Sequence, residues 1–302
     1  MRMRVFFGAI IISIAMSATA IGQISFSEDQ FRVFSGKGIP ASFEEIINST
    51  EAADVLFFGE YHDDAVGHAI QAEAFRRIVE RYSGKRKITL SLEMFERDVQ
   101  VVLDEYLASH ITENHFLLSS RPWGNYKTDY RPLIELAKEK GLPVVAANAP
   151  RRYVNMVSRG GRAKVEALSP EAKRWLAPLP YGEPSAEYSK RFRALMGSSA
   201  EASMGLDNIL SSQSLWDATM AYWISQALER HKHGLIVHLN GGFHTAYRLG
   251  TVEHLAKYSP KAKAVVITMR YEENFKEFDK DKHADLGDFV ILTDGAVPRS
   301  AR

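Results

Sequence analysis

Two segments of the sequence share the form Gly-x-x-His, and both follow a short apolar run. GEYH at 59–62 comes after VLFF, and GGFH at 241–244 comes after LIVHLN. Glycine permits a tight turn and a close approach of the backbone at such positions. A third apolar run, at 87–92, leads directly into Glu93. The sequence therefore predicts that two imidazoles and two carboxylates lie at strand ends: Glu60, His62, Glu93 and His244.

These four side chains suit two kinds of chemistry. Two neutral imidazoles with one or two carboxylates can bind a divalent metal ion. The same groups can act as general base and general acid without a metal. In a hydrolase, His62 and His244 would hold the ion or position a water, and Glu60 or Glu93 would take the proton of that water. All four are therefore candidate catalytic residues and candidate metal ligands.

Plainer interpretations of the same residues stay open. Glu60 can simply cap the next helix, His62 can be a surface loop residue, and Glu93 can form a salt bridge with Arg97. Asp217 lies on an otherwise apolar helix, where a buried charge needs a partner.

Other polar residues have ordinary roles available. Asn148 and Asn240 follow predicted strands, where asparagine is a common turn residue. His238 lies inside a strand and is expected to be a hydrogen-bonded core residue. His68, one turn into a helix, is expected to be solvated or stacked.

An aromatic segment, WGNYKTDY, occupies 123–130 within a region, 110–128, that we expect to be irregular. It can pack as an ordinary loop. It can also offer a platform to a flat ligand, with a phenol that binds ferric iron as in some haem proteins.

Strands that alternate with helices must position these groups. Short apolar runs predict strands at 54–58, 87–92, 143–146, 235–239, 264–269 and 289–292. Periodic patterns predict helices at 42–48, 99–107, 132–140 and 214–230. A further helix is predicted with Asp63 or Asp64 as its cap, an apolar face between Val66 and Val79, and Gly84 as its stop. Their alternation predicts an α/β fold with a mainly parallel sheet covered by helices on both faces. Ligands bind such sheets outside the carboxyl ends of the strands. The segment at about 151–213 is helical and broken by prolines, and we interpret it as a helical insertion or cap.

The N-terminus and the composition restrict the class of protein. Residues 1–20 have a basic start, an apolar stretch and an Ala-Thr-Ala site, as in a cleavable signal peptide. We expect one domain over 21–302. The 38 basic and 37 acidic residues give no electrostatic footprint for nucleic acid. The absence of cysteine excludes thiolate metal sites, a thiol nucleophile and an acylated-cysteine anchor. No segment beyond the signal peptide is apolar enough to cross a membrane.

Several motifs occur in an order that resembles the ChaN-like haem-binding uptake family of the Tiki and erythromycin-esterase-like superfamily. They are FFGEYHDD, SLEMFERDVQ, W-x-x-Y-x-x-x-Y, GLPVVAANAPRRYV, SLWDATMA and HLNGGFH, and the resemblance spans roughly 35–295. It implies an α/β fold with a helical cap. It also implies metal binding or, in some branches, hydrolysis at Glu60, His62, Glu93 and His244. A tyrosine is the iron ligand that it implies, and Tyr126 or Tyr130 matches that position.

The resemblance favours an exported haem- or iron-binding protein of iron or haem acquisition, either periplasmic or secreted. Its cofactor would be haem, and a divalent metal ion is the other option. The alternative is a metal- or His/Glu-assisted hydrolase of the esterase or peptidase kind. We expect haem or another small molecule as the partner and no nucleic acid, and a homodimer stays open. The family is often anchored as a lipoprotein, and this chain departs from that because it has no cysteine.

Overall fold

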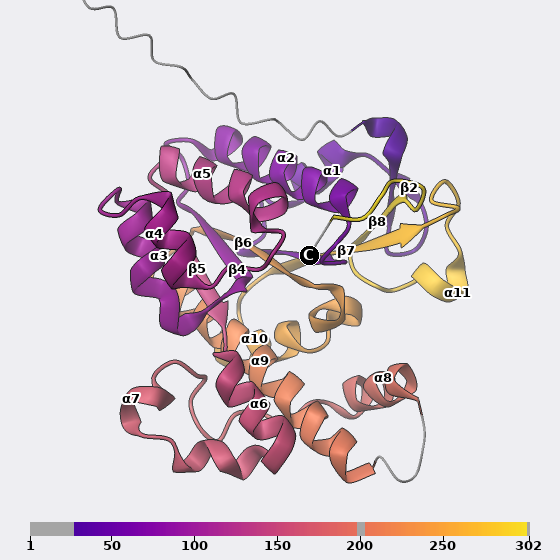
Figure 1. Cartoon of the computed structure of the whole chain (residues 1–302). Coiled ribbons are helices and arrows are strands. Elements are labelled where there is room, and N and C mark those ends of the chain that lie inside the picture. The colour runs from indigo at the N-terminus through magenta and orange to yellow at the C-terminus, as the bar shows by residue number, and fades with distance from the viewer. Residues whose placement is uncertain (1–26, 198–202, 301–302) are drawn as a thin grey trace, which may run out of the picture.

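An eight-stranded mixed sheet forms the centre of the molecule in the computed structural model (Figure 1). The structure describes residues 27–197 and 203–300, so the predicted signal peptide lies outside the described residues. The strands are β1 (Phe31–Ser35), β2 (Pro40–Ala41), β3 (Val55–Glu60), β4 (Ile88–Glu96), β5 (Val144–Asn148), β6 (Leu235–Gly241), β7 (Ala264–Glu272) and β8 (Phe289–Asp294). Their order is β2-β1-β8-β7-β3-β6-β4-β5, and all neighbours from β8 to β5 are parallel. The prediction of a mainly parallel sheet is confirmed.

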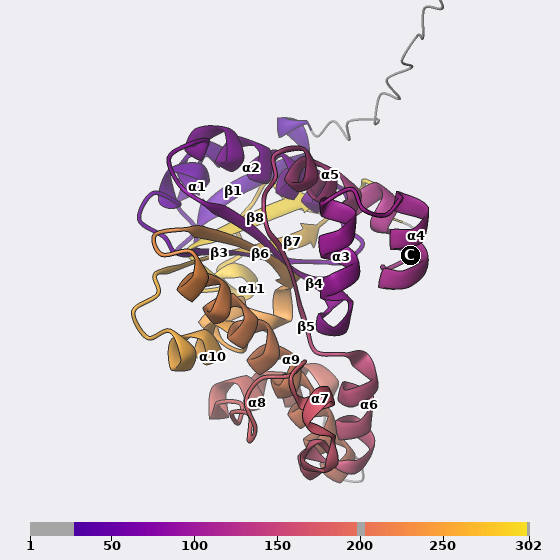
Figure 2. The ribbon, with the colours of Figure 1, turned by 90° about the vertical axis from the view of Figure 1, so that its left-hand side faces the viewer.

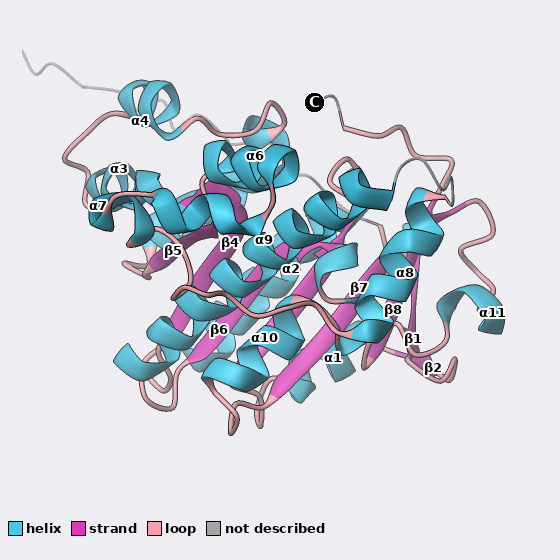
Figure 3. Cartoon of the chain, turned by 90° about the horizontal axis from the view of Figure 1, so that it is seen from below, coloured by secondary structure: helices cyan, strands magenta, loops and turns pink. Residues whose placement is uncertain are grey.

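Helices cover both faces of this sheet, as predicted (Figures 1 and 2). One face carries α1 (Phe43–Ser49), α2 (Ala65–Tyr82), α3 (Gln100–Leu107) and α5 (Arg131–Glu139). The other face carries α9 (Ser203–Arg230) and α10 (Thr251–Tyr258). A short helix, α11 (Lys280–His283), lies beside the edge of the sheet that β1 and β2 form (Figure 3).

Strand β3 shows why the sequence forms a sheet with two covered faces. Successive side chains of a strand point to opposite faces. Leu56 and Phe58 pack into the core beneath α2, whereas Val55 and Phe57 pack into the core beneath α9 and α10. All four side chains are fully buried. A strand buried on both faces reads as a continuous apolar run, and that is the VLFF pattern of the sequence.

The helical segment after β5 forms a separate layer beyond the sheet (Figures 1 and 2). It contains α6 (Arg151–Gly160), α7 (Pro170–Lys173), α8 (Ala186–Met196) and the first half of α9. The sequence predicted a start for α9 near 214, and that prediction is wrong because the helix begins at Ser203. Leu206 and Leu210 of the added turns pack against Tyr188 and Phe192 of α8. Tertiary packing therefore extends a helix that its local pattern does not predict.

The region at 110–128 is more regular than the sequence indicated. It contains α4 (Glu113–Ser120), and the Thr112 side chain caps this helix by accepting a hydrogen bond from the His115 amide. Phe116 is buried on its inner side. A single π-helical turn, Tyr126–Tyr130, leads into α5. Across 27–197 and 203–300 no helix combines the length and apolar character needed to cross a membrane.

Candidate functional site

The carboxyl ends of β3, β4 and β6 bring the predicted residues together. Glu60 at the end of β3 pairs with Gly241 at the end of β6, and β4 lies on the other side of β6. His62 and His244 come two and three residues after those ends. Glu93 was expected just past a strand, but β4 continues to Glu96, and its pairing with β5 is irregular between Leu92 and Glu96. This irregularity lies where Glu93 must turn its side chain towards the sheet edge.

His62 is held by a buried carboxylate. Its Nδ1 atom donates to Glu60 Oε1 at 2.9 Å, and the same oxygen accepts from the Tyr130 hydroxyl at 2.6 Å. Gln71 Nε2 of α2 donates to Glu60 Oε2 at 2.7 Å. Burial alone would raise the pKa of Glu60, but the nearby imidazoles of His68 and His62 and the donated hydrogen bonds lower it. Glu60 is therefore an ionised group that orients His62.

His244 is held in the same way by a different carboxylate. Its Nδ1 atom donates to Asp217 Oδ1 of α9 at 2.7 Å, and Thr251 Oγ1 donates to the same oxygen at 2.8 Å. Burial alone would lower the pKa of His244, but the charges of Asp217 and Glu93 raise it to about 9. Asp217, the acid on an apolar helix that needed a partner, therefore has His244 as its partner and keeps it protonated at neutral pH.

Glu93 lies between the two imidazoles. Its Oε2 atom accepts from the Gly241 amide at 2.6 Å, which fixes the side chain. Its Oε1 atom is 3.8 Å from His244 Nε2 and 4.0 Å from His62 Nε2. Those distances are too long for hydrogen bonds. Both Nε2 atoms therefore remain available to a ligand, and we refer to Glu60, His62, Glu93, Asp217 and His244 as the two-histidine centre.

Steric contacts explain why glycine occupies positions 241 and 242 beside this centre. A Cβ atom on Gly241 would lie 2.7 Å from His62 Nε2. A Cβ atom on Gly242 would lie 3.3 Å from Arg270 Nη1. Glycine at both positions therefore leaves room for an imidazole on one side of the turn and a guanidinium on the other.

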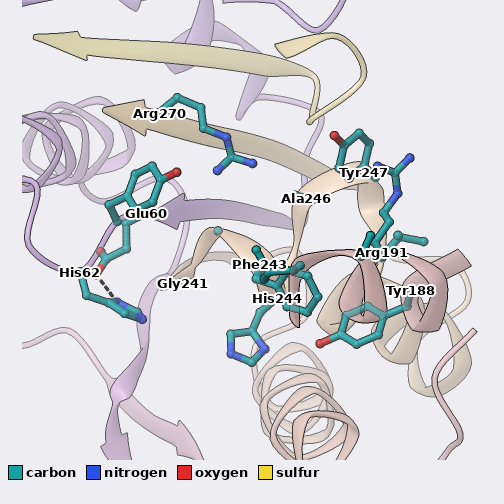
Figure 4. A pocket seen from close by; sticks show the side chains of 15 residues that line it. Glu60, His62, Tyr188, Arg191, Gly241, Phe243, His244, Ala246, Tyr247 and Arg270 are labelled. Atoms are coloured by element: carbon teal, nitrogen blue, oxygen red, sulfur yellow. Dashed lines mark hydrogen bonds and ion pairs between the residues drawn. The ribbon is translucent and has the colours of Figure 1, made fainter. Parts of the chain in front are cut away.

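Two cavities meet at the two-histidine centre, and His62 and His244 line both. The first, the tyrosine cavity, has a volume of about 590 Å³ (Figure 4). Its lining includes Tyr61, Tyr188, Arg191, Phe243, Tyr247 and Arg270. The second, the tryptophan cavity, has a volume of about 880 Å³. Its lining includes Trp123, Asn148, Arg151, Arg152, Asn155 and Trp216.

The two predicted iron ligands lie away from these cavities. Tyr126 and Tyr130 are 2% and 0% exposed, and neither lines the tyrosine or the tryptophan cavity. Burial raises the pKa of both phenols, and Tyr130 already donates its hydroxyl to Glu60. Trp123 is the member of this aromatic segment that reaches a cavity, and its ring lies edge-on 4.7 Å from the His62 ring.

Other residues singled out in the sequence are also placed. His238 is fully buried, and its ring nitrogen lies 2.9 Å from Ser91 Oγ, so the predicted core histidine is confirmed. His68 is buried and stacks edge-on against Tyr130. Asn240 donates to Gly241 O within the turn. Among the residues described, no group of three or more histidine and acidic side chains is arranged to hold a metal ion. The expected divalent metal therefore has no support in the structure.

Sequence reasoning missed the residues that complete the cavities. Trp216 and Tyr188 come from the helical layer, and Arg270 comes from the end of β7. Their spacing in the sequence has no motif, because α8, α9 and β7 meet only in the folded chain.

Comparisons with known proteins identify a family for this chain and a solved structure with a similar fold. A family model described as "Haem-binding uptake, Tiki superfamily, ChaN" matches residues 46–255. The solved structure titled "Cofacial heme binding to ChaN of Campylobacter jejuni" is 21% identical, with a TM-score of 0.69 over 90% of this chain and 100% of that chain. An erythromycin esterase mutant in its open conformation is 14% identical, with a TM-score of 0.45 over 80% of this chain and 77% of that chain. No curated protein sequence matches the chain.

Proposed function

The chain belongs to the haem-binding uptake family, ChaN, of the Tiki superfamily, and from this we propose that it is an exported haem-binding protein of iron or haem acquisition. The predicted signal peptide supports a periplasmic or secreted location. The absence of cysteine argues against attachment through an acylated cysteine.

The observation that carries the proposal is the pair of cavities that meet at two imidazoles with free Nε2 atoms. Volumes of about 590 and 880 Å³ lie in the range of small-molecule sites. Aromatic side chains line both, and Trp123 and Trp216 each lie edge-on to a histidine of the centre. Flat aromatic walls with a few polar groups suit a planar ligand such as haem. The residues present therefore fit the group that the family binds.

A phenolate or an imidazole would hold ferric haem iron in such a site. Ligation by Tyr126 or Tyr130 stays a prediction. Both phenols would have to leave the core, and Tyr130 would also have to release Glu60. Tyr188 and Tyr247 line the tyrosine cavity, where Tyr247 is half-buried and Tyr188, although only 1% exposed, already borders the space that a ligand would fill. We propose these two as the alternative ligands.

Titration with haemin, followed by its absorbance spectrum, tests the proposal. The protein should bind haemin with a Soret band distinct from that of free haemin and with a ferric phenolate spectrum. Replacing Tyr188 and Tyr247 together by Phe should abolish the phenolate features, whereas the Tyr126→Phe, Tyr130→Phe pair should retain them. The reverse result would restore the original assignment. A titration that gives only the absorbance spectrum of free haemin would refute haem binding by this chain.

A second candidate function is hydrolysis of an ester or peptide bond, and the geometry of the two-histidine centre favours it. The oxygens of Glu60 are occupied by three donors, so of the two predicted bases, Glu60 and Glu93, it is Glu93 that has an oxygen, Oε1, free to take a proton from water. The hydroxide would attack the carbonyl carbon. Protonated His244 would give its proton to the leaving group as the bond to that group breaks.

A panel of chromogenic ester and peptide substrates, together with elemental analysis, separates the two functions. Turnover that is lost in Glu93→Gln and His244→Asn would favour the hydrolase, with a bound metal as one form of it. Haemin binding without turnover or stoichiometric metal would favour the carrier. Glu105→Gln is the matched control for Glu93→Gln, because Glu105 is a half-buried residue of α3 that lines neither cavity.

A further inference from the structure

Arginine side chains line both cavities, and one of them differs from the rest. The four are Arg151 and Arg152 in the tryptophan cavity and Arg191 and Arg270 in the tyrosine cavity. Three are in ion pairs: Arg151 with Glu96, Arg152 with Asp98 and Arg191 with Glu187. Across the described residues, no carboxylate lies within 4.0 Å of the Arg270 guanidinium, so it forms no ion pair there.

Arg270 is placed to meet a ligand. It lies near the end of β7, is half-buried, and points towards the space between Glu60 and the Gly241-Gly242 turn (Figure 4). The one hydrogen bond that its guanidinium makes within the described chain, from Nη1 to Met269 O, is long at 3.4 Å. The guanidinium carbon lies 5.8 Å from the centre of the Tyr61 ring. Gly242 leaves the space that this guanidinium occupies.

Glu60, the acid in the lining of the tyrosine cavity, forms no ion pair with the Arg270 guanidinium. The carboxylate of Glu60 is bound by His62, Gln71 and Tyr130. A guanidinium presents five donors in a planar fork that matches a carboxylate with two parallel hydrogen bonds. A half-buried arginine without a partner loses hydration that an anionic ligand can restore.

We propose that Arg270, with Tyr61 beside it, binds a carboxylate of the ligand in the tyrosine cavity. The inference rests on the proposed haem binding, and it assigns this subsite to a propionate side chain of haem. The residues of the two-histidine centre that line the same cavity, His62 and His244, would then contact another part of the ligand. A free organic acid or inorganic phosphate offers similar chemistry, so the experiment separates these sources.

The experiment compares haemin with haemin dimethyl ester, in which both propionates are esterified. Wild-type protein should bind haemin about 10-fold or more tightly than the ester, as expected for a hydrogen-bonded charge pair. Arg270→Gln should weaken haemin binding by a similar factor and leave binding of the ester unchanged, and Arg270→Lys should lie between. Arg248→Gln is the matched control, because Arg248 pairs with Asp288 and lines neither cavity.

Three results would overturn the subsite. Equal binding of both compounds by wild type and by Arg270→Gln would refute the role of Arg270 while leaving haem binding intact. If millimolar acetate or phosphate removes the preference of wild type for haemin over the dimethyl ester, Arg270 forms a general anion site instead of a propionate site. Failure of wild type to bind either compound would refute the proposed function, and the subsite with it. A thermal unfolding curve of Arg270→Gln that matches wild type shows that the variant is folded.

Discussion

Replacing Asp217 by Asn should lower the pKa of His244 and so change the charge of the site at neutral pH. Asp217 Oδ1 lies 2.7 Å from His244 Nδ1 inside the core. Asn preserves the shape of the side chain and an oxygen that can accept this hydrogen bond, but it removes the charge. Burial then still lowers the pKa of His244, and Glu93 is the one remaining charge of the two that raises it. We expect the value to fall from about 9 towards or below the ordinary 6.5.

The same change has a consequence for stability. A pKa raised from 6.5 to about 9 corresponds to roughly 3 kcal/mol, at about 1.36 kcal/mol per unit. Because the folded-state pKa lies above the unfolded-state value, this stabilisation is fully present below pH 6.5. It is lost as the pH rises through about 9. Asp217→Asn should therefore be destabilised relative to wild type by up to about 3 kcal/mol near pH 6, and the difference should shrink above pH 9.

Two measurements check this reasoning. An NMR titration of the imidazole signals, with His244→Gln to assign the peak, gives the pKa directly. Urea unfolding at pH 6 and at pH 9.5 gives the two free energies. Asp207→Asn is the control, because Asp207 is an exposed residue of the same helix that pairs with Arg193. An unchanged pKa in Asp217→Asn, or a stability difference that does not depend on pH, would refute the assignment of Asp217 as the partner of His244.

Three further predictions concern single side chains. Phe58→Ala should lower the free energy of unfolding by about 3–5 kcal/mol, because the ring is fully buried beneath α2; a loss below about 1 kcal/mol in urea unfolding would contradict its place in the core. His62→Ala should impair haemin binding while leaving the melting temperature of the ligand-free protein nearly unchanged or raised, and a variant that unfolds would make His62 a structural residue. Gly241→Ala should weaken haemin binding because its methyl group would meet the His62 ring; Gly205→Ala, where nothing lies within 4 Å of the added carbon, should keep wild-type affinity, and equal affinity of the two variants would count against the steric argument.

The strands and the strand-end residues could be predicted because they depend on local patterns. A continuous apolar run such as VLFF indicates a strand buried on both faces, and parallel strands deliver the residues after them to one edge. Glu60, His62 and His244 were found in this way, and Asp217 was noticed because an acid on an apolar helix needs a partner. The Gly-Gly pair before Phe243 also had a local signal, although its steric reason needed the structure.

The rest depends on contacts between distant segments. Tyr130 was predicted to lie in an aromatic loop and to be a possible iron ligand, but the turn at 126–130 carries it into the core, where it donates to Glu60. Tyr188 and Trp216 reach the cavities only because α8 and α9 pack beyond the sheet. Arg270 is one of many arginines in the sequence, and its lack of an acidic partner is a property of the folded chain. Local patterns contain no information on such pairings.

The most direct test of the central claim is the affinity for haemin of a variant in which His62 and His244 are both replaced by Ala. The claim is that haem binds where the two cavities meet at these imidazoles. Absorbance titration should show tight, saturable binding by wild type and by the control pair His110→Ala, His115→Ala, which lies on exposed segments. The His62, His244 variant should bind at least about 10-fold more weakly, as expected when two ligand-facing polar groups are lost. Wild-type affinity in that variant would contradict the claim and would place haem elsewhere on the protein.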